Sequence, residues 1–437
     1  MLACALAACS GGGATSAQPI VNQQVPGPGV GTGGGTVTPS PVPTASPAPT
    51  PTPQPTAVPT ATPVPGPSAQ PADPNLRVPT GFIVSKIATV GLARELAALP
   101  NGDLIVGTGG TAVAIVPNAE SSGAAGAVAT FANIGDAPVN GVAYGGGFVF
   151  VAAQNGVYRI PYTTGARSGT PQKIASVRTQ GDSGHNTSSI AVSGSSLYVG
   201  VGSSCNACVE TDPTRASIQR MGLDGSGMTV QAKRWRNPIG LATDPTTGTV
   251  WAGGAGQDGL AQGHPYEYLD PVSSRTAPAD YGWPDCEENR VAYTAGANCS
   301  NVVVPAVALP AYSTVIGMAF YPASQTGAYA FPTAWRGGLF VGLHGSWHEI
   351  NNIPVAPPHV AFVPFSGASP ARAVSWNDPT TQWNDFFTGF QNGTTRYGRP
   401  TGVAVGAQGS LFVANDDSGA IFRIRPAGTA TSGVGRR

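Results

Sequence analysis

One pattern of apolar and polar positions recurs six times between Glu95 and Ile424. Most copies begin with a small residue that is followed closely by Ala, pass through a turn rich in Gly, Asp, Asn or Pro, and end in alternating apolar residues. The copies begin at Glu95, Gly141, Ser189, Gly240, Gly317 and Gly402. Alternation with a period of two is typical of a half-buried strand, so each copy predicts a strand, a tight turn and a second strand.

The spacing of the copies predicts how these strands are assembled. The first four copies are roughly 45 to 50 residues apart and the later ones about 80, which fits four-stranded blades with insertions in the later blades. Two copies continue into a third strand, at 157–160 and 421–424. Because such a blade cannot bury both faces alone, we predict an all-β fold, a six-bladed β-propeller. The alternative is a β-sandwich, which needs fewer matching hairpins.

Composition divides the chain into four parts. Residues 1–9 resemble the remnant of a lipoprotein signal, 10–73 form a disordered linker rich in Pro, Thr and Gly, 74–427 form the propeller, and 428–437 form a flexible tail. Leu6-Ala-Ala-Cys9 resembles a bacterial lipobox, in which the Cys thiol takes the lipid. We therefore expect a lipid anchor through Cys9 and a place in the bacterial periplasm or at the cell surface. The residues before Cys9 are short and uncharged for a signal peptide, which is consistent with a start upstream of Met1, and a chance match is the alternative.

Charge argues against a nucleic-acid partner, and hydropathy argues against a membrane-spanning helix. Only 10% of residues are charged and the formal net charge is zero, so nucleic acid is not an expected partner. No run of 18 apolar residues follows the N-terminus, so no segment is expected to span a bilayer as a helix.

Four cysteines of the predicted propeller can be read in more than one way. Cys205-Asn-Ala-Cys208 could be a redox pair or half of a zinc site, but neither a second CxxC nor a His pair at ligand spacing accompanies it. In an exported protein two structural disulfides are the simpler account, Cys205 with Cys208 and Cys286 with Cys299.

Polar side chains gather at the predicted entrances of the later blades. His185 lies just before the third copy, Arg236-Asn237-Pro238 just before the fourth and Arg399-Pro400 just before the sixth. Pro238 holds the preceding pair extended, and a rigid Arg and Asn suit a ligand that bears carboxylates. His344 and Gln257-Asp258-Gly259 follow the second strands of the fifth and fourth copies. We therefore expect a site at one mouth of the central pore, built by blades three to six.

Several of these segments resemble the glucose/sorbosone dehydrogenase family, and most of all its sorbosone branch. The resemblance runs from about Arg77 to Arg425 and is carried by the His185 loop, Gly202 to Glu210, Arg236 to Ala242, Asp280 to Cys286, Arg336 to Trp347 and Gly398 to Val405. Members of this family are six-bladed propellers that oxidise sugars with pyrroloquinoline quinone and calcium. The resemblance therefore implies an enzyme with this cofactor, a small-molecule sugar substrate and a downstream electron acceptor.

The resemblance also implies roles for individual residues. His185 would be the general base that removes the hydroxyl proton while the sugar carbon passes hydride to the quinone. The cofactor would be bound by Arg236, Asn237, His344 and Arg399, with Thr314 as a further neighbour. Calcium would bind backbone carbonyls near Asp258 and Gly259 together with cofactor oxygens.

Two other functions remain open at this point. A six-bladed propeller with a pore calcium can hydrolyse sugar lactones, but such a site needs several acidic or Asn side chains around the pore. A non-catalytic surface propeller that only binds a ligand is the other alternative. The aromatic residues Trp283 and Trp347 could stack on a sugar or fill the space between blades, and for Trp283 we expect packing.

Overall fold

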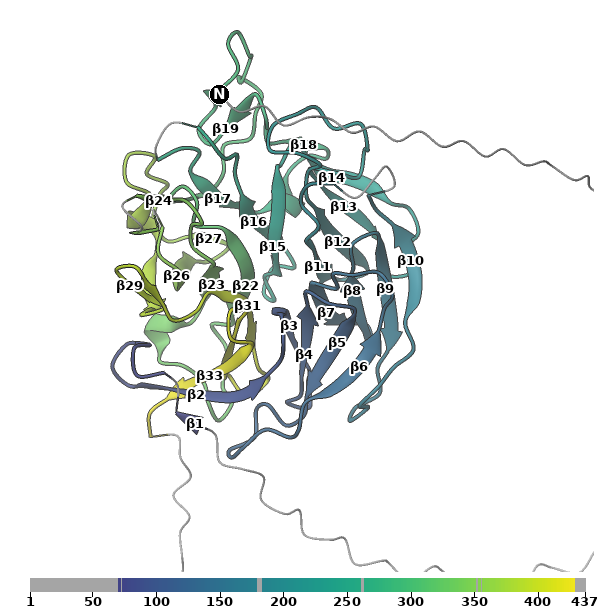
Figure 1. Ribbon diagram of the computed structural model, residues 1–437, viewed down its shortest axis with the longest axis vertical. Coiled ribbons are helices and arrows are strands. Elements are labelled where there is room, and N and C mark those ends of the chain that lie inside the picture. The colour runs from purple at the N-terminus through teal and green to yellow at the C-terminus, as the bar shows by residue number, and fades with distance from the viewer. Residues whose placement is uncertain are drawn as a thin grey trace, which may run out of the picture. The chain divides into compact units, whose positions relative to one another are not determined.

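The computed structural model describes residues 73–178, 183–260, 263–350, 353–354 and 356–428, together with strand β1 (Gln70–Pro71). The described residues form a six-bladed β-propeller, as predicted (Figure 1). The leader at 1–9, nearly all of the predicted linker at 10–73 and nearly all of the tail at 428–437 lie outside the described residues. Within the described part, no helix has the length and apolar character needed to cross a membrane.

Each blade is an antiparallel sheet whose first strand is innermost (Figure 1). Blade one contains β3 (Ala93–Ala98), β4 (Leu104–Thr108), β5 (Ala112–Val116) and β6 (Ala129–Asn133). Blade two contains β7 (Gly141–Gly145), β8 (Phe148–Ala152), β9 (Gly156–Pro161) and β10 (Gln172–Ser176). Blade three contains β11 (Ser188–Ser193), β12 (Ser196–Val201), β13 (Ser217–Gly222) and β14 (Thr229–Lys233).

The later blades contain the predicted insertions. Blade four contains β15 (Asn237–Thr243), β16 (Val250–Ala255), β17 (Glu267–Asp270) and β21 (Val307–Leu309). Blade five contains β22 (Val315–Tyr321), β23 (Gly338–Leu343), β26 (His359–Ser366), β27 (Ser369–Pro370) and β28 (Asn384–Phe387). Blade six contains β31 (Pro400–Val405), β32 (Leu411–Asn415) and β33 (Ala420–Pro426).

Short elements occupy the insertions. They are η1 (Val272–Ser274), β18 (Ala279–Asp280), β19 (Cys286–Glu287), β20 (Val291–Ala292), η2 (Thr333–Trp335), β24 (Glu349–Ile350), β25 (Ile353–Pro354), η3 (Pro379–Gln382), β29 (Gln391–Asn392) and β30 (Thr395–Arg396). Strand β18 pairs in parallel with β14, so the insertion of blade four extends the sheet of blade three. Both predicted disulfides are present, with Cα–Cα distances of 6.2 Å for Cys205–Cys208 and 5.8 Å for Cys286–Cys299.

The ring is closed by a strand that the sequence analysis did not predict. Strand β2 (Phe82–Thr89) precedes the first copy of the repeat but pairs with β33, with Ile83 opposite Arg425. Blade six therefore takes strands from both ends of the described chain. The innermost strands contact one another in the order β3, β7, β11, β15, β22, β31 and back to β3.

The apolar core explains why six blades need a closed ring. Within the described residues, six of the apolar clusters each lie between two neighbouring blades, as where Ile105 of blade one shares a cluster with Val151 of blade two. An open arrangement would leave one such face in water at each end. The small first residue of the repeat allows close contact, because a Cβ at Gly317 would lie 2.3 Å from the carbonyl oxygen of Thr401 in the next blade.

Candidate functional site

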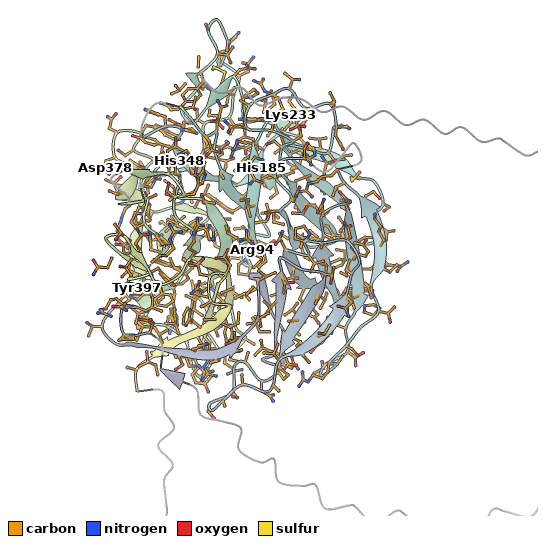
Figure 2. All side chains as sticks on the ribbon, viewed as in Figure 1. Arg94, His185, Lys233, His348, Asp378 and Tyr397 are labelled. Atoms are coloured by element: carbon orange, nitrogen blue, oxygen red, sulfur yellow. A yellow bond between two sulfur atoms is a disulfide. The ribbon has the colours of Figure 1, made fainter. Side chains whose placement is uncertain are left out.

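The candidate site residues come to one end of the ring because of the strand order. Neighbouring strands are antiparallel, so the residues before an innermost strand lie beside those that follow the second strand. His185, Asn237 and Arg399 lie before or at the start of innermost strands, whereas Asp258 and His344 follow second strands. Arg94 and His185, which come from blades one and three, lie near the middle of the ring in Figure 2.

His185 is half-buried, and its contacts define which ring nitrogen carries the proton. Its Nδ1 lies 3.2 Å from the carbonyl oxygen of Ser203 and 2.9 Å from the Ser203 hydroxyl. That hydroxyl donates to the carbonyl of Cys205 at 2.6 Å, and a carbonyl can only accept. Nδ1 is therefore the donor, and Nε2 is the unprotonated nitrogen of the neutral ring.

The charge state of His185 follows from its surroundings. Burial, together with the nearby Arg236 guanidinium, lowers the pKa of His185 to about 4. The imidazole is therefore neutral near pH 7. A neutral imidazole whose Nε2 makes no hydrogen bond to another described residue can accept a proton.

Arg236 is buried and is held by two neighbouring loops. Its guanidinium donates to Asp258 Oδ2 at 2.6 Å and to Asn206 Oδ1 at 2.9 Å. The second oxygen of Asp258, Oδ1, lies 3.1 Å from Nε2 of His348. Asn206 stands between the cysteines of the Cys205–Cys208 disulfide, so this disulfide fixes a residue that contacts both Arg236 and Asp258.

Asn237 is buried beside His185, and its side-chain oxygen has no hydrogen-bond partner among the described residues. A Cβ at Gly202 would lie 2.5 Å from this oxygen and also 2.5 Å from Cβ of His185. Both side chains therefore pack against the Gly202 backbone, where only a glycine fits. A buried amide oxygen without a partner is costly, and a polar ligand at this position would satisfy it.

The far side of the pore mouth is held by a carboxylate that the sequence analysis missed. Asp416 follows β32, and its Oδ2 lies 2.8 Å from Nε2 of His344 and 2.7 Å from NH1 of Arg94. Burial lowers the pKa of His344 to about 4, against the opposing effect of Asp416. Arg94 belongs to β3 of blade one, so the site is not limited to the predicted blades three to six. Its place directly before Glu95, where the first copy begins, is the signal that could have identified it.

Arg399 completes this side of the mouth. Its guanidinium donates to the carbonyl oxygens of His344 at 3.0 Å and Gly345 at 2.7 Å, and it forms no ion pair with a described residue. Its positive charge is therefore not neutralised by direct contact with a described carboxylate. This is the electrostatic arrangement that an anionic ligand requires.

Thr314 lies in a strained loop between the two sides. The backbone of Thr314 has φ 55° and that of Tyr312 has φ 63°, in the left-handed region that bulky and β-branched residues rarely adopt. The Thr314 amide donates to Oε2 of buried Glu267 at 2.6 Å, and its carbonyl accepts from the amide of His344 at 2.9 Å. Backbone strain of this kind clusters at functional sites, and here it positions Thr314 next to His344.

The predicted calcium loop fits a metal only through its backbone. The carboxylate of Asp258 is taken by Arg236 and His348, and its carbonyl oxygen accepts from Asn206 Nδ2 at 2.8 Å. Gly259 has φ 80° and open space around its Cα. Among the described residues, the one cluster of possible side-chain metal ligands is Cys205, Cys208 and Glu210, and the disulfide removes both thiolates.

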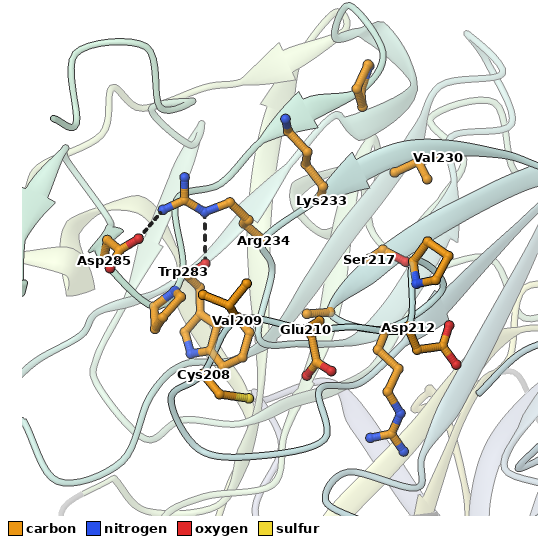
Figure 3. A pocket seen from close by; sticks show the side chains of 15 residues that line it. Cys208, Val209, Glu210, Asp212, Ser217, Val230, Lys233, Arg234, Trp283 and Asp285 are labelled. Carbon is orange, nitrogen blue, oxygen red and sulfur yellow. Dashed lines mark hydrogen bonds and ion pairs between the residues drawn. The ribbon is translucent and has the colours of Figure 1, made fainter. Parts of the chain in front are cut away.

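A separate cavity of about 490 Å³ is lined in part by Cys208 of the disulfide loop (Figure 3). Its lining includes Val209, Lys233, Arg234 and Trp283, and Figure 3 shows Arg234 turned toward Asp285, which it contacts at 2.9 Å. Trp283 is 1% exposed and donates to the Asn206 carbonyl at 3.0 Å, so it packs inside the protein as predicted. The cavity contains none of the predicted site residues.

The sequence is similar to known proteins over part of its length. Residues 287–427 match a family model described as TrAA12-like. An uncharacterized protein of Borreliella burgdorferi is 24% identical over 234 residues, which cover 52% of this chain and 56% of that protein. The chain thus matches only about half the length of this relative.

Solved structures match over most of the propeller. The holo PQQ domain of pyranose dehydrogenase from Coprinopsis cinerea is 20% identical, with a TM-score of 0.64 over 83% of this chain and 98% of that chain. The calcium structure of a Trichoderma reesei enzyme of Carbohydrate-Active Enzymes Family AA12 is 20% identical, with a TM-score of 0.68 over 82% and 99%. The PQQ-bound aldose sugar dehydrogenase of Streptomyces coelicolor is 19% identical, with a TM-score of 0.55 over 80% and 99%.

These matches confirm the expected likeness to quinoprotein sugar dehydrogenases at the level of the fold, and none of them singles out the sorbosone branch. The chain has the six-bladed propeller fold shared by the sugar dehydrogenases and the AA12 enzymes.

Proposed function

We propose that this protein oxidises a sugar with pyrroloquinoline quinone (PQQ) as cofactor and His185 as general base. The observation that carries the proposal is the neutral imidazole of His185, with Nε2 unprotonated, next to Arg236 and the unpartnered side-chain oxygen of Asn237. A base near a carboxylate-binding group is what proton removal from a substrate beside an anionic cofactor needs. The solved propellers of similar fold include sugar dehydrogenases with PQQ in their names, which supports the same chemistry here.

The residues present fit an anionic cofactor. Arg399, with a charge that no described carboxylate neutralises by contact, and Arg236 would bind its carboxylates, and Asn237, Thr314 and His344 would contact its polar edges. When bound, PQQ supplies a quinone carbonyl carbon that accepts hydride. The protein would orient the sugar hydroxyl toward Nε2 of His185, which takes the proton, while Ser203 keeps Nδ1 as the donor.

Calcium is proposed at the loop of Asp258 and Gly259. Because the Asp258 carboxylate already pairs with Arg236 and His348, the ion would depend on backbone carbonyls and on cofactor oxygens. The calcium structure of the Trichoderma reesei enzyme gives a precedent on this fold.

The pore charges favour this function over a calcium-dependent lactonase. A lactonase site needs carboxylates that are available to a metal, whereas Asp258 and Asp416 each contact an Arg and a His.

We also propose that the protein is lipid-anchored through Cys9 at the periplasmic or outer surface and passes electrons to a separate acceptor. Replacing Cys9 with Ser in the full chain should release it from the membrane fraction.

The test is reconstitution of the purified full chain. The protein is incubated with PQQ, with and without calcium, and dye reduction is followed with a panel of aldoses and sorbosone. The expected result is sugar-dependent dye reduction that requires PQQ. Lactone hydrolysis without PQQ would select the lactonase, and PQQ-independent sugar binding without turnover would select a binding propeller.

A further inference from the structure

Trp347 is an exposed aromatic residue close to the candidate site. It is 66% exposed, whereas Trp251 and Trp283 are each 1% exposed. The other large exposed apolar side chains of the described residues are aliphatic, namely Ile83, Leu92, Val128, Val209, Met228 and Val291. A single exposed apolar residue needs no special cause, so exposure alone does not assign a role to Trp347.

The contacts of Trp347 connect it to the site. Its ring centroid lies 3.8 Å from that of His348. The His348 ring also contacts Tyr312, with 4.3 Å between the two ring centroids. His348 Nε2 lies 3.1 Å from Asp258 Oδ1, and the same carboxylate binds Arg236. Trp347 is thus joined through one imidazole and one carboxylate to a residue proposed to hold the cofactor.

Trp347 lies nearer to the surface than the residues proposed to hold the cofactor. Arg236 and Asn237 are 4% and 5% exposed, whereas Trp347 is 66% exposed. A ligand that reaches from these buried residues to Trp347 must therefore extend toward the surface. The indole, whose plane is inclined by 32° to that of the His348 ring, is thus a platform nearer to the surface than the position proposed for the reacting sugar.

The chemistry of the platform fits a pyranose ring. A sugar ring has an apolar face of C–H groups and a rim of hydroxyls, and it packs on a flat indole while the rim binds polar groups. A tryptophan presents a large contact area with few rotatable bonds, so its ordering entropy is small.

We propose that Trp347 binds a second sugar ring, adjacent to the ring that is oxidised, so that the substrate class is an oligosaccharide or the end of a sugar chain. This inference rests on the proposed function, because it takes the reacting ring to lie beside His185. It predicts that the enzyme prefers substrates with two or more rings, and that the preference depends on Trp347.

The test compares sugars that differ only in length. The PQQ-loaded full chain is assayed with glucose, maltose, maltotriose, cellobiose and cellotriose, and kcat/KM is measured for the wild type, Trp347→Ala and Trp347→Phe. In Trp347→Ala the ratio of disaccharide to monosaccharide kcat/KM should fall about tenfold, as for the loss of a well-packed apolar contact. Trp347→Phe should keep most of the ratio, and Met228→Ala, a change of an exposed apolar residue in another blade, should leave it unchanged.

A second readout does not depend on turnover. Binding of maltotriose and cellotriose to the protein without PQQ is measured by calorimetry, and Trp347→Ala should weaken it by a similar factor. Monosaccharide turnover with no dependence of the length ratio on Trp347 would overturn this inference and leave the proposed function intact. Absence of PQQ-dependent turnover with every sugar would contradict the proposed function, and trisaccharide binding that depends on Trp347 would then survive as a property of a binding propeller.

Discussion

Nε2 of His344 lies 2.8 Å from Oδ2 of Asp416, and this contact joins blade five to blade six at the pore mouth. The same oxygen lies 2.7 Å from the guanidinium of Arg94, whose blade is the first in the chain. One carboxylate therefore ties three blades together where the ring closes. Nδ1 of His344 takes no part in this contact, and the guanidinium of Arg399 donates to the backbone carbonyl oxygen of His344 instead.

Replacing Asp416 with Ala should destabilise the ring. His344 and Arg94 would lose their shared acceptor while remaining largely buried, and an unsatisfied buried polar group costs about 1–3 kcal/mol. The free energy of unfolding in urea measures the effect. The matched control is Asp417→Ala, because the side chain of Asp417 is exposed, and that change should stay within about 0.5 kcal/mol. Equal changes in the free energy of unfolding for the two substitutions would show that the contacts of Asp416 with His344 and Arg94 do not stabilise the fold.

Gly202→Ala should disturb the site while leaving the propeller folded. The added Cβ would lie 2.5 Å from both Asn237 Oδ1 and His185 Cβ, so both side chains must move. A misplacement of about 1 Å in the reacting groups can lower turnover about 100-fold. Steady-state kinetics of the PQQ-loaded variant measures it, and Gly135→Ala is the control because its Cβ would meet nothing within 4 Å. Wild-type turnover in Gly202→Ala would place the base elsewhere.

The two disulfides should differ in what they support. The bond between Cys205 and Cys208 spans 3 residues and holds Asn206, which accepts a hydrogen bond from Arg236, whereas the bond between Cys286 and Cys299 spans 13 residues and holds no described residue that hydrogen-bonds Arg236. Loop-closure entropy gives about 2 kcal/mol for the short loop and about 3 kcal/mol for the longer one. The variant Cys205→Ala/Cys208→Ala should therefore lose more PQQ affinity, and Cys286→Ala/Cys299→Ala more stability. Titration calorimetry and urea unfolding test this order, and the reverse order would contradict it.

The pKa of His185 should be low and should depend on Arg236. Burial and the positive charge of Arg236 both disfavour the imidazolium, which lowers the pKa to about 4. Removing the charge in Arg236→Gln favours the protonated form, so the pKa of His185 should rise toward its ordinary value near 6.5, without reaching it while the ring stays buried. NMR titration of the imidazole in the apoprotein measures both. A midpoint near 6.5 in the wild type would mean that His185 is exposed to water.

The blades could be predicted from the sequence because the pattern that marks each of them is local. The alternation and turn of each copy lie within about a dozen residues, and the polar residues His185, Asn237 and Arg399 could be placed by their position relative to a copy. The disulfide pairing was accessible for a similar reason, since the cysteines of each pair are close in sequence.

Other features depend on contacts between distant residues, which no local pattern records. Arg94 and Asp416 are 322 residues apart in the sequence, and β2 pairs with β33 across a similar separation. The proton position on His185 depends on Ser203 and Cys205, which lie in the loop after β12. The opposite exposures of Trp283 and Trp347 likewise follow from tertiary packing, because each Trp follows a Gly within two residues and the local sequence does not record what packs against the indole.

The measurement that tests the central claim most directly is a rapid-mixing experiment on the PQQ-loaded protein and its His185→Asn variant. Absorbance of the bound quinone is followed after mixing with a sugar that the wild type oxidises, and PQQ affinity is measured in parallel. The proposed mechanism predicts that both proteins bind PQQ with similar affinity, and that the quinone is reduced at least about 100-fold more slowly in His185→Asn, since general-base catalysis contributes 10²–10⁴-fold. Quinone reduction at the wild-type rate in His185→Asn, or failure of the wild-type protein to bind PQQ, would contradict it.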